Sequence, residues 1–222
     1  MTESSPSWDW ILRGGYVGMC LTFTRGVTPE DLLRRYGADP SAANSITFAQ
    51  AYELIQPGPD SSILRVGSLG EWAFCCETLG VQGIMPAVLA ALSQSTQTVA
   101  FNHGADARHT LDHWADGQPR EHFEPGAKPS LQAAGVHPFW DAAERHRADN
   151  PDRPDELNTL EAVSDRIGGH LTTDIVHGRL LTTFLPWTLP PLPSPAAPLP
   201  FVHAPNPRPL GPLLGTSRPP TR

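Results

Sequence analysis

Four histidines and five acids fall within one short stretch of the sequence and could together form a catalytic or metal-binding site. They are His103, His109, His113, His122, Asp106, Asp112, Asp116, Glu121 and Glu124. Imidazoles and carboxylates perform general acid–base catalysis, and two histidines with one carboxylate form a common metal-ligand set. The candidate ligands are His109, His122 and Glu124. Whether they converge depends on how the strands that carry them pair.

The dipeptide Asp116-Gly117 predicts a β-hairpin between those strands. If these two residues form the whole turn, His109, His122 and Glu124 share one face of the hairpin. The 109–124 segment would then support a metal-dependent or histidine–carboxylate-dependent enzyme. The same register places an aspartate of one strand opposite a glutamate of the other, which is unfavourable.

The alternative is a three-residue loop at 116–118, which sets Asp112 opposite His122 and His113 opposite Glu121. Charges then match and apolar residues meet, although the glycine does not occupy the last loop position that such loops favour. On balance this register fits better, and it disperses the candidate ligands into ordinary cross-strand pairs. We therefore predict no catalytic residue, no bound metal and no cofactor.

Other reactive groups and phosphate-binding motifs give no stronger signal. The sequence contains no G-x-x-x-x-G-K-[ST] and no G-x-S-x-G motif. Cys75 and Cys76 are neighbours on an expected strand, so their side chains point to opposite faces. Neither of them, nor Cys20, has the electropositive setting of a reactive thiol. We expect Cys20 and Cys76 to be small buried side chains, and all three thiols to be unpaired in a reducing, cytoplasmic setting.

The segment 186–222 differs in composition from the rest of the 222-residue chain. It holds 13 of the 25 prolines, three arginines and no acid. Proline interrupts helices and strand ladders, so we expect a Pro-rich, extended and disordered tail. Its PxxP spacings are typical of groove-docking segments, but they also arise in any solvated proline-rich tail.

Residues 1–185 are expected to form one globular domain with 23 acids against 13 basic residues, a net charge of -10. This charge argues against a nucleic-acid partner. The sequence starts without a basic, then apolar, secretory segment, and its longest apolar run is far shorter than the roughly 20 residues of a membrane span. We expect a cytoplasmic protein with no membrane partner.

Hydrophobic periodicity in residues 1–185 predicts an α+β fold whose antiparallel sheet has about five to six strands. Thr28, Pro29 and Gly37 are typical of the start and end of a helix. A hairpin turn is expected at 67–70, and the part from about residue 130 is expected to be helical. The expected strands are 16–24, 63–66, 71–77, 98–102, 108–114 and 120–123, and the expected helices are 29–36, 48–55, 84–92, 138–148 and 154–167.

Several blocks of the sequence resemble an uncharacterised actinobacterial domain family of unknown function. The blocks are 18–26, 28–37, 66–74, 116–125 and 160–186. The resemblance covers roughly residues 8–186 and excludes the proline-rich tail. It implies no agreed activity, cofactor or catalytic residue.

These observations predict a non-enzymatic, cytoplasmic protein-interaction or regulatory module, with an enzyme built on the 109–124 hairpin as the alternative. The acidic charge favours a basic protein partner, which is compatible with an immunity-like role. Trp8, Trp187 and Arg120 are the expected partner contacts, because indole and guanidinium groups dominate interface hot spots.

Overall fold

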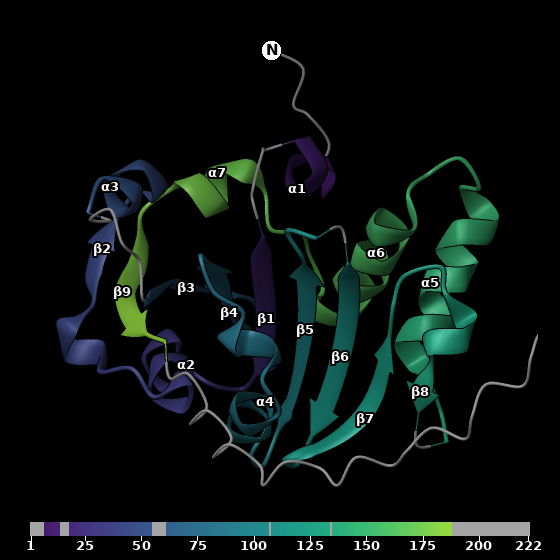
Figure 1. The fold of residues 1–222 in the computed structure, drawn as a ribbon, viewed down its shortest axis with the longest axis horizontal. Helices are drawn as coiled ribbons and strands as arrows, with labels where there is room; N and C mark the ends of the chain where they lie inside the picture. The colour runs from purple at the N-terminus through teal and green to yellow at the C-terminus, as the bar shows by residue number, and fades with distance from the viewer. Residues whose placement is uncertain (1–6, 14–17, 55–60, 107, 134, 188–222) are drawn as a thin grey trace, which may run out of the picture. The chain divides into compact units, whose positions relative to one another are not determined.

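The computed structural model describes residues 7–13, 18–54, 61–106, 108–133 and 135–187. Within these ranges the chain has an α+β fold built on a nine-stranded antiparallel sheet (Figure 1). The strand order is β2-β9-β3-β4-β1-β5-β6-β7-β8. The strands are β1 (Met19–Arg25), β2 (Asn44–Ile46), β3 (Ser61–Leu69), β4 (Trp72–Thr78), β5 (Gln97–His103), β6 (His109–Ala115), β7 (Gln118–Phe123), β8 (Gln132–Ala133) and β9 (Leu180–Pro186).

Seven α-helices and three short 3-10 helices connect these strands in the described ranges. The α-helices are α1 (Asp9–Arg13), α2 (Pro29–Tyr36), α3 (Phe48–Glu53), α4 (Pro86–Leu92), α5 (Pro138–Asp149), α6 (Asp155–Ile167) and α7 (Thr173–His177). The 3-10 helices are η1 (Pro40–Ala42), η2 (Gln82–Ile84) and η3 (Lys128–Ser130).

The α+β class and the antiparallel sheet are confirmed, but the predicted number of strands is wrong. The three additional strands are β2, β8 and β9. β2 and β8 have three and two residues, too few to show an alternating pattern. β9 also corrects the expectation of a purely helical part beyond residue 130. It includes Pro186, the first residue of the expected tail, whereas the tail from residue 188 onward lies outside the described residues.

Local signals correctly locate the ends of α2. The Thr28 hydroxyl accepts a hydrogen bond from the Asp31 amide at 3.1 Å, and Pro29 is the first helical residue. Gly37 ends the helix with φ of 87°, a left-handed conformation that favours glycine. These capping interactions fix the chain direction directly after β1.

The β3–β4 hairpin forms, but its turn is displaced from the predicted position at 67–70. Leu69 pairs with Trp72, so the turn consists of Gly70 and Glu71. Gly67 lies within β3 opposite Phe74, where an added Cβ would come within 2.6 Å of the phenyl ring. The strand therefore needs glycine at this position to make room for the aromatic ring.

Hydrophobic side chains pack on both faces of the sheet. On the first face, α1, α5, α6 and α7 pack against β1 and β4 to β7, and α5 and α6 lie side by side (Figure 1). On the second face, α2 and α4 pack against β3 and β4. In β4, Trp72, Phe74 and Cys76 face the first core while Ala73 and Cys75 face the second, as the alternation predicts.

A buried arginine links the strands at the β2 end of the sheet. Arg65 of β3 is 1% exposed and donates hydrogen bonds to the carbonyl oxygens of Gly178 at 2.7 Å, Ile46 at 3.3 Å and Val176. Its guanidinium carbon lies 5.4 Å from the centre of the Phe48 ring. One side chain thus connects β3 with the end of β2 and with the segment that leads into β9.

Candidate anion-binding pocket

The β6–β7 hairpin combines both of the registers that the sequence allows. Next to the turn, Trp114 lies opposite Pro119, as in the two-residue turn, and both turn residues have positive φ (54° and 72°). Beyond a β-bulge, Asp112 lies opposite His122, as in the three-residue loop. Arg120 is the extra residue of β7 at this bulge.

The three candidate metal ligands do not converge. His109 and His122 lie on opposite faces of the sheet. His109 Nε2 is 3.5 Å from a carboxylate oxygen of Glu156, whereas His122 Nδ1 is 2.9 Å from Asp112 Oδ1. Glu124 is exposed just beyond the end of β7. In the described part of the chain, no group of three or more His, Cys, Asp or Glu side chains is placed to hold a metal ion.

Glu121 holds the start of α5 against β7. It is 1% exposed, and its carboxylate accepts hydrogen bonds from the backbone amides of Phe139 at 3.1 Å and Trp140 at 2.7 Å. Burial raises the pKa of this carboxyl, and the two amide bonds offset part of that rise. Free amides and the helix dipole at an N-terminus favour such a group, so Glu121 has a structural role.

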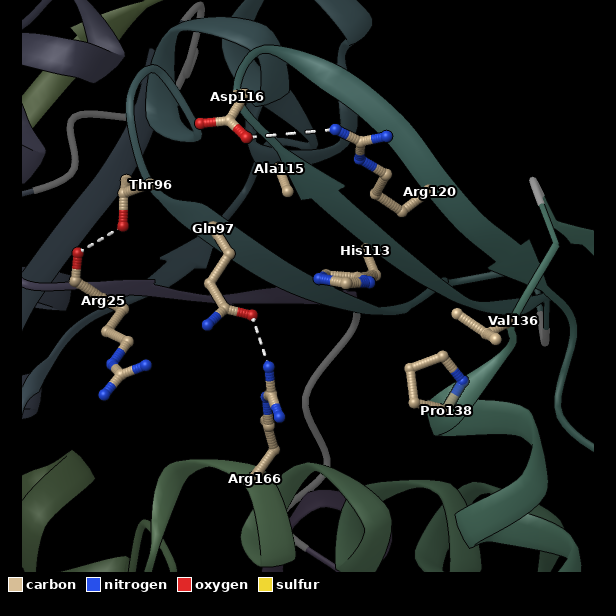
Figure 2. A pocket seen from close by; sticks show the side chains of 10 residues that line it. All are labelled: Arg25, Thr96, Gln97, His113, Ala115, Asp116, Arg120, Val136, Pro138 and Arg166. Carbon is tan, nitrogen blue, oxygen red and sulfur yellow. Dashed lines mark hydrogen bonds and ion pairs between the residues drawn. The ribbon is translucent and has the colours of Figure 1, made fainter.

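A pocket of about 560 Å³ opens on the first face, where the ends of β1, β5 and β6 approach α5 and α6 (Figure 2). Its size lies within the usual range for small-molecule sites. Its lining residues are Arg25, Thr96, Gln97, His113, Ala115, Asp116, Arg120, Val136, Pro138 and Arg166.

Three arginines make this pocket cationic in an otherwise acidic chain. Arg25 pairs with Glu71 at 2.8 Å and Arg120 with Asp116 at 3.9 Å, and all four side chains are about half exposed or more. Exposed pairs of this kind contribute little energy and exchange partners easily. Arg166 makes no ion pair with a carboxylate among the described residues. The guanidinium groups can therefore accept an additional anion.

Arg166 is positioned by a neutral partner. It extends from α6 toward the sheet and donates from Nη2 to Gln97 Oε1 at 3.0 Å (Figure 2). The amide orients the guanidinium over the start of β5 without neutralising it, so the full positive charge remains at the pocket.

His113 forms part of the pocket wall and is buried, with 8% of its surface exposed. Neither of its ring nitrogens has a hydrogen-bond partner among the described residues, and its ring meets Phe139 edge-on at 5.0 Å. Burial, followed by the positive charges of Arg166 and Arg120, lowers the pKa of His113 to about 4. The imidazole is therefore neutral at pH 7 and lies in a positive field.

This arrangement is suited to binding an anion rather than to covalent catalysis. Guanidinium groups bind carboxylates and phosphates through two parallel hydrogen bonds, and a neutral imidazole can donate one more. Among the described lining residues, the only hydroxyl belongs to Thr96, and it donates to the Arg25 carbonyl oxygen at 2.7 Å. No activated nucleophile therefore faces the space where an anion would lie.

The three residues predicted to contact a partner differ in their exposure and location. Trp8 is 0% exposed and donates from its indole to Ser164 Oγ at 2.7 Å, so the expectation that it forms an exposed contact is wrong. Trp187 is 41% exposed at the end of the described chain. Arg120 lines the pocket, where the bulge places it.

The sequence did not identify Arg25 and Arg166 as site residues, and it favoured a cross-strand pair with Glu121 for His113 over a role in a site. These residues come from β1, α6 and β6. No spacing along the chain relates the three elements, because their arrangement depends on the packing of α6 against the sheet.

The three cysteines are buried and free. Burial is the main reason why the pKa values of Cys20 and Cys75 lie well above the ordinary value and that of Cys76 is about 12. Their thiols are therefore protonated at neutral pH, which is typical of structural cysteines.

Comparisons with known proteins place the chain in a family. No curated protein and no solved structure matches it. No helix in the described ranges is long and apolar enough to cross a membrane. A family model described as a family of unknown function, DUF6461, matches residues 7–161, which include three of the cationic pocket's four basic side chains: Arg25, His113 and Arg120. The chain belongs to this family of unknown function.

Proposed function

We propose that this chain is a non-enzymatic interaction module whose cationic pocket binds an anionic group of a partner. The observation that carries the proposal is that Arg25, Arg120 and Arg166 line one pocket together with the buried His113, whose ring nitrogens have no hydrogen-bond partner among the described residues. A carboxylate or phosphate is the chemistry that such a set of donors recognises.

The expected partner is a protein in the cytoplasm. Three free thiols in the core fit a reducing compartment. The net charge of -10 over residues 1–185 steers the module toward a generally basic partner and away from nucleic acid. A regulatory or immunity-like role is in keeping with this charge.

The alternative, a metal-dependent or histidine–carboxylate-dependent enzyme on the 109–124 hairpin, has less support. His109 lies on the face opposite to His122, and Glu124 is exposed beyond the end of β7. The proposed interaction module does not require His109, His122 and Glu124 to lie close together.

The experiment is a titration of the protein with inorganic phosphate and with succinate at low ionic strength, followed by NMR. We expect the imidazole signals of His113 to shift on binding, because the anion lies beside the ring. Arg166→Gln should weaken binding about tenfold, as expected for the loss of one charge-assisted contact.

Arg34→Gln is the matched control, because it removes an equal charge from an exposed position on α2. Equal effects of the two substitutions would show that the anion responds only to overall charge. A His113 signal that does not move at saturating anion would also reject the pocket as the site.

A further inference from the structure

A second cavity lies on the second face of the sheet, over strands β5, β6 and β7. α2 and α4 pack over β3 and β4, while β6 and β7 present Thr110, Asp112, Trp114 and His122 on this face. A groove of about 800 Å³ runs over these residues, bounded by η2 and the start of α4 on one side and by the β5–β6 loop on the other. We refer to it as the acidic groove.

Acids outnumber cations among the residues that line the acidic groove. Asp106, Asp112 and Glu124 contribute carboxylates, against the guanidinium of Arg108 and the imidazole of His122, whose pKa is raised by its hydrogen bond to Asp112. η2 and α4 contribute only apolar side chains to the lining, so they do not offset this charge. His122 is hydrogen-bonded to Asp112 at 2.9 Å, which holds that carboxylate in place on the floor of the groove.

A buried side-chain amide whose oxygen accepts no hydrogen bond from the described residues is a second, independent observation that points to a ligand in the groove. Asn102 of β5 lines the groove and is 7% exposed, and its Oδ1 has no hydrogen-bond partner among the described residues. Buried polar atoms are nearly always hydrogen-bonded, and an orphaned acceptor costs free energy until a donor reaches it. The groove thus combines negative charge with an acceptor that lacks a donor.

We propose that the acidic groove binds an arginine side chain from a basic segment of a partner protein. A guanidinium carries five donors in one plane, enough to reach carboxylates and an amide oxygen together. Trp114 lines the same groove and offers an indole on which this plane can stack. The proposal is independent of the anion-binding pocket, because the two cavities lie on opposite faces of the sheet.

The test measures binding of a fluorescent glycine–arginine peptide to the full chain by fluorescence anisotropy. A peptide with citrulline in place of arginine keeps the shape and removes the charge. We expect the arginine peptide to bind and the citrulline peptide to bind at least about tenfold more weakly. Glu124→Gln and Asp112→Asn should each weaken binding of the arginine peptide about tenfold.

Asp152→Asn is the control, because this exposed carboxylate lies between α5 and α6, outside the groove, and its removal changes the net charge equally. Glu124 is exposed, so its variant should fold normally even if Asp112→Asn does not. Equal losses in Glu124→Gln and Asp152→Asn, or equal binding of both peptides, would overturn the proposal. Arg166→Gln should leave peptide binding unchanged, so failure of the anion-binding pocket can be distinguished from failure of the groove.

Discussion

His113 and Glu121 lie directly opposite each other on β6 and β7, yet Glu121 is hydrogen-bonded to the first amides of α5 and leaves the imidazole without a hydrogen-bond partner among the described residues. A carboxylate that bonded to His113 would favour the charged imidazolium. Because Glu121 instead caps the helix, burial and the neighbouring arginines determine the protonation of His113. The wall of the pocket therefore contains a neutral, buried imidazole.

The pKa of His113 predicts a specific pH dependence of stability. Its folded-state pKa of about 4 lies below the ordinary value of 6.5, so between these values the unfolded chain binds more protons than the folded one. The free energy of unfolding should thus fall as the pH is lowered through this window. His113→Phe removes this contribution, and we expect its loss of stability between pH 7 and pH 5 to be smaller by about 2 kcal/mol. Urea unfolding at both pH values measures the difference, and identical losses would contradict the assigned pKa.

Removal of the charge on Glu121 should loosen α5. Glu121→Gln keeps one acceptor oxygen but loses the charge at the helix N-terminus, and we expect a cost of about 1–2 kcal/mol in the free energy of unfolding. Glu144→Gln on the exposed side of α5 should change stability by less than about 0.5 kcal/mol. Chemical unfolding of both variants measures these values, and equal stabilities would refute the capping role.

The two tryptophans expected at a partner surface should behave differently when truncated. Trp8→Ala leaves a cavity in the core and removes the hydrogen bond to Ser164, so we expect a destabilisation of about 3–5 kcal/mol. Trp187→Ala, at a half-exposed position, should cost less than about 1 kcal/mol. Thermal unfolding followed by circular dichroism compares them; similar melting temperatures would place Trp8 at the surface after all.

Gly67 should be intolerant of even one methyl group. Gly67→Ala places a Cβ against the Phe74 ring and a methyl group of Leu180, and we expect a loss of about 1–3 kcal/mol in unfolding free energy. Gly169→Ala, where the nearest atom would be 3.5 Å away in ordinary contact, is the control and should be nearly neutral. If urea unfolding gives the same midpoint for both variants, Phe74 can move aside and the close approach is not required.

Elements specified by neighbouring residues could be predicted from the sequence. Thr28 and Gly37 mark the ends of α2 through contacts within a few residues, and the alternation in β4 assigns Trp72 and Cys75 to opposite faces. The predicted 108–114 and 120–123 strands correspond to β6 and β7, but neither proposed register describes the whole pair. The bulge at Arg120 joins them, and neither the pairing of charges nor the turn chemistry alone requires a bulge.

Features that depend on distant contacts could not be predicted. The burial of Trp8 depends on Ser164, more than 150 positions along the chain. The pocket depends on α6 bringing Arg166 to Gln97. Short-range periodicity contains no information about such contacts, because the same pattern is compatible with many ways of packing helices on a sheet.

The position of β9 has a consequence for the order in which the molecule can be built during translation. This strand is the last of the described elements to leave the ribosome, yet it lies inside the sheet between β2 and β3. A nascent chain that ends before Leu180 leaves the hydrogen-bonding edge of β3 bare and β2 without a neighbour. Until residues 180–186 have left the ribosome, the incomplete sheet exposes this edge, and unpaired strand edges of this kind are prone to pair with other chains.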